Sequence, residues 1–338
     1  MKVLITGVAG FVGSTLARKL IDGNPSVEII GIDNLRYGYK ERIEDIEDKI
    51  RFYHMDVKDL AFGLKETNID IIIHCAAIAP LPENQADLYE SINQNVAMCA
   101  SVSEFATNIG CENIIFFSSG AIYEGSGNKA CRENDTINTS LIYPTSKFLA
   151  EQLFQSLAKT YGFKVVAIRL FNLYGPNQDY FRKQPPLLGY LLKNIHKGEV
   201  SKIFASKNAK RDYIHINDLY HLVNKICEKF KDIKTGEFIA VNAGSGKIYS
   251  VFDILKEIGQ VVGSDINYVV GDKKDFWNKY PKIFDKKLPL KQEFLLDEVD
   301  KIAIADIQFA QKFFEWSPRV EMKDGLKECY EFSKEVLK

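Results

Sequence analysis

The stretch KVLITGVAGFVG at residues 2–13 decides the fold of this chain. Its first part, Lys2–Thr6, is a short apolar run of the kind that forms a buried β-strand. Gly7 permits a tight turn, Gly10 lets a pyrophosphate approach the backbone, and Gly13 lets helix and strand pack closely. A phosphate placed there meets the N–H groups at the positive end of the following helix, predicted over residues 13–22. The stretch therefore predicts a dinucleotide-binding unit.

Asp33 sharpens this prediction. It follows a second β-branched run, residues 27–32, and comes 20 residues after Gly13. A carboxylate at the end of that strand accepts hydrogen bonds from the adenosine ribose hydroxyls and repels a 2′-phosphate, which favours NAD over NADP. Arg36 is close enough in the sequence to leave the NADP alternative open.

Strand-like and helix-like segments alternate along the first half of the chain. Further strands are predicted at residues 50–55, 70–75, 114–119 and 164–171, with helices at 92–107 and 144–161. This alternation predicts an α/β fold with a doubly wound parallel Rossmann sheet and a smaller C-terminal α/β domain. We expect the cofactor domain over residues 1–175, with later strands returning from about 205–245, and a mainly substrate-binding domain over 176–338. The charged stretch 272–300 is predicted to be a long loop or excursion.

Composition and charge argue against several classes of function. The hydrophobic content of 46% and the charged content of 26% are typical of globular proteins. A formal net charge of -1 leaves no basic excess for nucleic acid or an anionic membrane, and there is no apolar run of about 18 residues. The six cysteines form no CxxC pair and the five histidines have no metal-ligand spacing. We therefore expect no metal and a reducing, cytoplasmic location.

The candidate chemistry lies in the segment YPTSK at residues 143–147. It places the phenol of Tyr143 and the ammonium of Lys147 four residues apart at a predicted helix start, so both side chains face the same way. A nearby cation favours the phenolate, which predicts a lowered pKa for Tyr143 and a role as general base. Ser119 ends a predicted strand, where ligands bind in such sheets. The plainer alternative is a packed tyrosine beside a solvated lysine.

These motifs, taken in order, resemble the extended short-chain dehydrogenase/reductases, in particular the NAD-dependent nucleotide-sugar epimerase/dehydratase family and its UDP-glucose 4-epimerase-like members. The resemblance covers nearly the whole chain. It is carried by TGVAGFVG at 6–13, DN at 33–34, DV at 56–57, HCAA at 74–77, NV at 95–96, SSGAIY at 118–123, YPTSK at 143–147, RLFNLYGP at 169–176, RDYIHINDL at 211–219 and ADIQFAQKFFEWSP at 305–318.

The resemblance implies a role for each matching residue. The implied cofactor-binding residues are Gly7, Gly10, Phe11, Val12, Gly13, Asp33, Asn34, Asp56, Val57, Cys75, Ala76, Ala77, Asn95, Tyr143, Lys147 and Phe171. The implied catalytic residues are Ser119, Tyr143 and Lys147, and the implied substrate-binding residues are Ser119, Asn172, Phe204 and Arg211, of which Arg211 would hold a diphosphate. The plainer alternatives are a surface ion pair for Arg211 and Asp212, and a helix cap for Asp218.

The resemblance further implies a homodimer and a nucleotide-diphosphate sugar as substrate. Tyr143 would remove the proton of the C4 hydroxyl while hydride passes to a retained NAD, and the 4-keto sugar would take the hydride back on its other face. A net 4-dehydrogenase or 4-ketoreductase is the first alternative. A non-catalytic NAD-binding sensor is a further one.

Two departures bear on the substrate. Gly120 and Ala121 stand where 4,6-dehydratases carry an Asp-Glu pair, so dehydration ranks low. Relatives generally place a second diphosphate-binding arginine just before the Gly-Asp found here at 271–272, and this chain has Tyr268-Val-Val270 there. Lys273, Lys274 or another residue of the segment up to 300 could replace that arginine.

Overall fold

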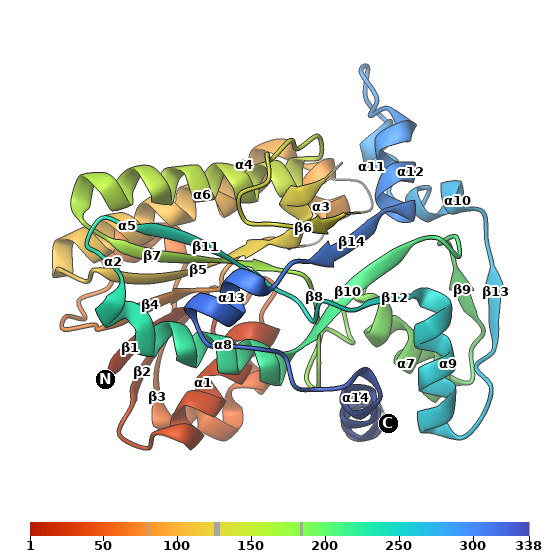
Figure 1. Ribbon diagram of the computed structural model, residues 1–338, viewed down its shortest axis with the longest axis horizontal. Helices are drawn as coiled ribbons and strands as arrows, with labels where there is room; N and C mark the ends of the chain where they lie inside the picture. Colours follow the sequence, from red (N-terminus) through yellow and green to blue (C-terminus); the bar gives the residue numbers. More distant parts are fainter. Residues whose placement is uncertain (80, 125–128, 183–184, 338) are drawn as a thin grey trace.

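The protein is built around a parallel sheet, described here from a computed structural model that covers residues 1–79, 81–124, 129–182 and 185–337. Seven strands lie in the order β11-β7-β5-β4-β1-β2-β3 (Figure 1). Their bounds are β1 Lys2–Thr6, β2 Glu28–Asp33, β3 Ile50–His54, β4 Ile71–His74, β5 Asn113–Ser119, β7 Lys164–Leu170 and β11 Phe238–Ala243. The order reverses between β1 and β4, and the predicted Rossmann class is confirmed.

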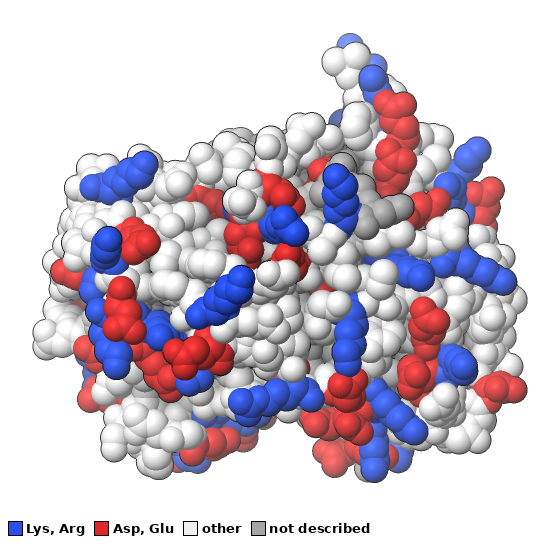
Figure 2. Space-filling model, in the orientation of Figure 1, with Lys and Arg blue, Asp and Glu red and all other residues white. Residues whose placement is uncertain are grey.

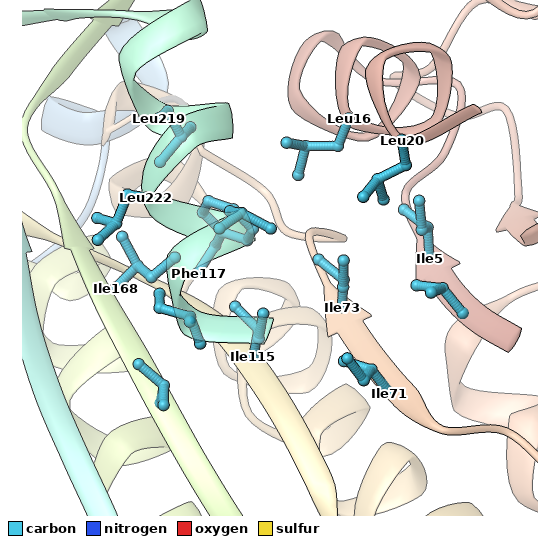
Figure 3. Close-up of a cluster of buried hydrophobic side chains, with 14 of the residues drawn as sticks. Ile5, Leu16, Leu20, Ile71, Ile73, Ile115, Phe117, Ile168, Leu219 and Leu222 are labelled. Atoms are coloured by element: carbon cyan, nitrogen blue, oxygen red, sulfur yellow. The ribbon is translucent and has the colours of Figure 1, made fainter. Parts of the chain in front are cut away.

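Helices cover both faces of this sheet because successive strand residues point to opposite sides. On one face, α1 (Phe11–Gly23), α8 (Ile216–Lys229) and α13 (Gln308–Phe313) pack on residues such as Ile5 and Ile73 (Figure 3). On the other face, α2 (Leu60–Gly63), α5 (Ala97–Ile109) and α6 (Ile142–Tyr161) pack on Leu4 and Ile72. The helix predicted at 92–107 is in fact two, because Val96 separates α4 (Leu88–Asn95) from α5.

A smaller region lies beside the carboxyl ends of the strands (Figure 1). Its larger sheet holds β12 (Ile248–Ser250), β10 (Lys210–His215), β14 (Ile302–Ala305) and β6 (Ala130–Cys131), with β8 (Asn172–Tyr174) paired to β10. A second pair joins β9 (Ser201–Ile203) and β13 (Tyr268–Val270). The helices α7 (Leu187–Lys197), α9 (Val251–Val262) and α14 (Met322–Val336) supply the core of this region.

The expectation for residues 205–245 needs correction. Of the two strands in this stretch, β11 pairs with β7 in the main sheet, whereas β10 pairs with β8, β12 and β14 in the smaller one. The helix α8 between them packs on the main sheet. Neighbouring parts of the sequence thus alternate between the two regions, which a single boundary near 175 does not describe.

Of the two alternatives predicted for residues 272–300, a long loop or an excursion, the loop is wrong. This segment contains α10 (Lys273–Trp277), α11 (Pro281–Phe284) and α12 (Gln292–Asp300), which stand at the upper right of Figure 1. Trp277, Ile283 and Leu295 are buried together with Leu141, the residue that precedes α6. The apolar residues of the segment 272–300 are scattered among lysines and aspartates, and they come into contact only after the chain has folded back on itself. We call residues 272–300 the insertion.

Two negative findings apply to the part of the chain that the structure describes. No helix there is long and apolar enough to cross a bilayer. No group of three or more His, Cys, Asp or Glu side chains there could hold a metal ion.

Candidate active site

The glycine loop is shaped by close backbone contacts. Gly7 has a φ of 70°, a left-handed conformation that favours glycine, and a Cβ there would lie 2.9 Å from the backbone of Ala76. A Cβ on Gly13 would lie 2.2 Å from the carbonyl oxygen of Gly7. Gly10 is the N-cap of α1, and Phe11 and Val12 begin that helix and pack against the core. The loop therefore leaves the first turn of α1 open to a pyrophosphate.

Asp33 ends β2 beside this loop and is buried, 6% exposed. Its Oδ2 accepts a hydrogen bond from the Ala9 N–H (3.0 Å) and its Oδ1 one from the Leu35 N–H (2.8 Å). Burial raises the pKa of Asp33, which these hydrogen bonds partly offset. Arg36 is ion-paired with Glu90 rather than turned toward Asp33, which accords with NAD instead of NADP.

The remaining implied cofactor residues follow neighbouring strands. Asn34 donates from Nδ2 to Oδ2 of Asp56 (3.0 Å), and Asp56 caps the short helix that Val57 begins. Cys75, Ala76 and Ala77 follow β4 and are half-buried. Asn95, at the end of α4, accepts from the Ile78 N–H (2.9 Å) and donates to Oγ of Ser146 (3.0 Å). Asn95 thus ties the segment after β4 to α6.

The implied catalytic residues come from β5 and α6. Ser119 is the last residue of β5, and its Oγ accepts from the Ala121 N–H (3.1 Å). Tyr143 and Lys147 lie in the first two turns of α6. Nζ of Lys147 donates to the Phe117 carbonyl oxygen (2.8 Å) and lies 5.0 Å from the centroid of the Phe116 ring.

The predicted lowering of the Tyr143 pKa is wrong. Burial raises the pKa of Tyr143, and the Ser119 side chain and Arg182 only partly offset that rise. The ammonium of Lys147 instead faces the Phe117 carbonyl, and burial lowers its own pKa to about 8. The four-residue spacing places Tyr143 and Lys147 on the same face of the helix, but it does not determine which group the Lys147 ammonium contacts.

Two adjoining clefts open in front of these residues. The smaller, about 200 Å³, is lined by residues that include Ser119, Tyr143 and Phe171. The larger, about 540 Å³, is lined by Phe204 and by residues of the insertion. Both share Asn172, Arg211 and Glu298. The structure therefore brings every implied substrate-binding residue to one continuous wall.

Comparison with known proteins identifies the family. Residues 3–244 match the "NAD dependent epimerase/dehydratase family". The chain belongs to this family. Membership confirms the predicted NAD-dependent enzyme of the extended short-chain dehydrogenase/reductase type.

The similar proteins span the whole length of the chain. A putative UDP-glucose 4-epimerase of Methanocaldococcus jannaschii is 27% identical, covering 98% of either chain. A human dTDP-D-glucose 4,6-dehydratase is 28% identical, over 99% of this chain and 90% of its own. The solved UDP-glucose 4-epimerase of Thermotoga maritima, in complex with UDP-glucose, matches the fold with a TM-score of 0.84 at 23% identity, over 100% of both chains.

Arg211 of this family member is not in a surface ion pair with Asp212. The Arg211 guanidinium donates to the main-chain carbonyls of Lys301 and Glu298, at and just beyond the end of α12. Asp212 is fully buried on the other side of β10, accepts from the Ser245, Gly246 and Ala305 N–H groups, and has its pKa raised to about 6 by burial. Adjacent strand residues point to opposite faces, which separates the two.

The helix cap expected of Asp218 is also wrong. His215 caps α8 through its side chain. Asp218 lies in the first turn, and its carboxylate accepts from the N–H groups of Arg319 and Val320. It therefore tethers the segment before α14 instead of its own helix.

Several residues at the site carry no motif in the sequence. Arg182, Lys202 and Lys279 line the larger cleft, and the insertion adds Phe276, Trp277 and Tyr280. A chain with 44 Lys and Arg residues offers no spacing signal for three of them. The aromatic density of 276–280, with three aromatic rings in five residues, was the one available indication.

Replacing Lys147 by methionine should stabilise the nucleotide-free enzyme at pH 7 while abolishing turnover. Its pKa is about 8 when folded and 10.5 ordinarily, so below pH 8 the folded state bears the cost of a buried charge. Stability therefore rises as pH increases from 8 to 10.5. Allowing for the lost hydrogen bond to Phe117, we expect a gain of about 1–2 kcal/mol in the free energy of unfolding. Urea unfolding at pH 7 and pH 10 measures it.

The matched control is Lys159→Met, which removes an exposed lysine from the same helix and should change the free energy of unfolding by less than about 0.5 kcal/mol. A Lys147→Met protein that is less stable than the parent at pH 7 would contradict the assigned burial cost.

Proposed function

We propose that this family member is a nucleotide-sugar epimerase that acts through a transient 4-keto sugar. The observation that carries the proposal is the arrangement of Ser119 and Tyr143 in a small cleft that runs, past Arg211, into a larger one lined by cations and aromatic rings. The small cleft suits a single sugar ring, and the larger one suits a nucleoside diphosphate. The curated relatives named above act on sugars of this class.

The residues of the glycine loop fit the cofactor. A Cβ at Gly7 would collide with the backbone of Ala76, and one at Gly13 with the carbonyl oxygen of Gly7, so the loop keeps its shape only with glycine at both positions. Asp33 presents a carboxylate at the end of β2. Gly7, Gly10, Phe11, Val12 and Gly13 would hold the pyrophosphate. Asp33, Asn34, Asp56 and Val57 would hold the adenosine, and Cys75, Ala76, Ala77, Asn95, Lys147 and Phe171 the nicotinamide half. NAD supplies a reversible hydride acceptor.

The proton steps belong to Tyr143. Its phenolate oxygen takes the proton of the C4 hydroxyl as the C4–H bond gives up its hydride, which leaves a C4 carbonyl. Ser119 would hydrogen-bond the same oxygen, and its side chain lowers the Tyr143 pKa, whereas the Lys147 ammonium is held by the Phe117 carbonyl oxygen. After the 4-keto sugar turns over, Tyr143 would give its proton back to the C4 oxygen as C4 is reduced on its other face. Burial raises the pKa of Tyr143, and bound oxidised NAD would supply a positive charge that counters this rise.

The competing reactions differ in whether they change the amount of NADH and in which acid–base groups they need. A 4-dehydrogenase or 4-ketoreductase uses the same residues but changes the amount of NADH in proportion to sugar. A 4,6-dehydratase needs acid–base groups after Ser119, and the enzyme has Gly120 there. A Cβ on Gly120 would lie 2.9 Å from the Phe171 ring, so this position does not accept a larger side chain without rearrangement.

The deciding experiment is to denature the purified enzyme and identify the released nucleotides. We expect NAD or NADH in near-stoichiometric amount, together with a trace of a UDP-, GDP-, CDP- or dTDP-sugar that identifies the base. The enzyme is then incubated with that sugar nucleotide. Interconversion of two C4 epimers without net change in NADH supports the proposal, whereas NADH that accumulates or disappears with the sugar supports the redox alternative. Bound NAD without turnover of any sugar nucleotide would favour a sensor.

A homodimer is a further part of the proposal. The helices α5 and α6 lie side by side over one face of the sheet (Figure 1), where α6 exposes Leu149 and Tyr161. Pairing of these helices with those of a second copy would form a four-helix bundle. We expect sedimentation equilibrium at micromolar concentration to give twice the chain mass of 38.4 kDa. A monomer at that concentration would exclude it.

We place the enzyme in the cytoplasm, without nucleic acid or membrane partners. All six cysteines lie in the described part of the chain, and none forms a disulfide. Figure 2 shows Lys and Arg interspersed with Asp and Glu over the face in view, rather than gathered in a basic patch. Such a surface supports binding of a small substrate over a polyanion.

A further inference from the structure

Two lysines converge on one aromatic ring in the larger cleft. Nζ of Lys202 lies 5.1 Å, and Nζ of Lys279 lies 5.0 Å, from the centroid of the Phe204 ring. The two ammonium groups are therefore no more than about 10 Å apart, by adding these two distances. Lys202 is the middle residue of β9, and Lys279 comes from the insertion, 77 residues later. All three side chains line the cleft.

The carboxylates of Glu83 and Glu298 also line the cleft, but Glu298 is paired with Lys301, and no salt bridge in the described part of the chain joins either carboxylate to the two lysines. The carboxylate of Asp275 lies 3.7 Å from Nζ of Lys202, and both groups are about half exposed, so the attraction is weak. Lys279 has no ion-pair partner there among the salt bridges of the structure. Like charges held near one another beside an aromatic wall favour the entry of an anion.

Arg211, a further cation of the cleft besides Arg182, has its donors engaged. Both Nη groups of Arg211 donate to the main-chain carbonyls of Glu298 and Lys301. These carbonyls lie at and just beyond the C-terminus of α12, where the helix dipole is negative. In this arrangement, Arg211 holds the end of the insertion in place and has little donor capacity for a ligand.

The insertion holds Lys279 at a defined place. Trp277 is buried, and its Nε1 donates to the Leu295 carbonyl oxygen (3.1 Å) across the insertion's own core. The same core contacts Leu141, two residues before Tyr143. Phe276 packs on the edge of Phe204, with ring centroids 5.7 Å apart. Lys273 and Lys274 are not part of the cleft: Lys273 is paired with Asp300, and Lys274 is exposed.

We propose that Lys279, together with Lys202, binds the diphosphate of the nucleotide-sugar substrate. The inference rests on the proposed function and assigns to the insertion the charge recognition expected of Arg211. Both lysines line the larger cleft only, so they face the nucleotide part of the ligand and not the sugar beside Tyr143. A diphosphate carries enough charge to engage both ammonium groups at once, which a monophosphate does less well.

The test compares nucleotide affinities of the NAD-loaded enzyme by titration calorimetry. The probes are UDP, dTDP, GDP and CDP, then the monophosphate and nucleoside of whichever base binds. The variants are Lys279→Met, Lys202→Met, their double variant, and Lys274→Met as the matched control on α10. Each single cleft variant should weaken diphosphate binding by roughly tenfold and the double variant by roughly a hundredfold. Nucleoside affinity and the control should be unchanged.

Three results would overturn the inference. Diphosphate affinity that is unaltered in the double variant excludes the lysines as the binding groups. An equal loss for diphosphate and nucleoside means that the substitutions disturb the cleft as a whole. If Arg211→Gln leaves the thermal midpoint unchanged but lowers the diphosphate affinity more than the double lysine variant does, Arg211 is the main diphosphate-binding group. If none of the four diphosphates binds the parent enzyme, the proposed function itself fails.

Discussion

Replacing Tyr143 by phenylalanine should lower kcat by about 10²–10⁴-fold, the usual contribution of a positioned general base. The ring remains, so packing in the small cleft is preserved, and only the oxygen that takes the C4 proton is lost. NAD content after purification should be unchanged, because the cofactor is held mainly by the glycine loop and Asp33. The measurement is initial-rate epimerisation with the sugar nucleotide identified from the denatured enzyme, alongside the released NAD.

The control for this substitution is Tyr89→Phe, which removes an exposed hydroxyl from α4, outside both clefts. It should leave kcat within about twofold of the parent, as for an ordinary surface change. Since the base must be deprotonated and burial raises the pKa of Tyr143, the parent's kcat/KM should increase with pH on the acid side. Tyr143→Phe with the parent's turnover would show that another group takes the proton, and the mechanism as proposed would fall.

Replacing Arg169 by leucine should lower the free energy of unfolding by about 3–5 kcal/mol, the cost of leaving one member of a buried pair alone. Arg169 on β7 donates to both carboxylate oxygens of Glu151 on α6, at 3.1 and 2.8 Å. Glu151 is 1% exposed and also accepts from Oγ of Ser118, the neighbour of Ser119. Arg169 in turn donates to the hydroxyl of Tyr123 (2.8 Å).

Two further variants distinguish the loss of the Arg169–Glu151 ion pair from a general disruption of the packing. The double variant Arg169→Leu with Glu151→Leu should recover most of the lost stability, because no charge then remains buried. Removing one member of the exposed Lys247–Glu321 pair, by Lys247→Met, should cost less than about 1 kcal/mol. Urea denaturation curves give the free energies of unfolding of the parent and of the three variants. An Arg169→Leu protein as stable as Lys247→Met would mean that the network does not hold β5, β7 and α6 together.

The fold class and the cofactor could be predicted because their signals are local. A strand buried on both faces is a continuous apolar run, as in residues 71–73, and a glycine loop is a matter of spacing. Backbone hydrogen bonding and side-chain size act over a few residues, so Gly7, Gly13 and Asp33 can be interpreted without any knowledge of the rest of the chain. Tyr143 and Lys147 share a helix face for the same reason.

The insertion shows where this local reasoning ends. Its sequence is dense in Lys and Asp, and a loop was predicted, yet Trp277, Ile283 and Leu295 form a core with Leu141. That core depends on residues that are more than 130 positions apart. The spacing of apolar residues within the insertion gives no indication that they pack against Leu141, so far away in the sequence.

By itself, then, the sequence determined a Rossmann sheet, an NAD-dependent enzyme, and a Ser, Tyr and Lys set at the ends of known elements. Only the tertiary structure decided what surrounds that set. Arg211 is turned toward carbonyls 87 and 90 residues away, Lys279 meets the ring of Phe204, and burial outweighs nearby charge in setting the pKa of Tyr143. The physical reason is that spacing along a helix or strand follows from backbone geometry, whereas burial and ion contacts depend on which distant segments pack together.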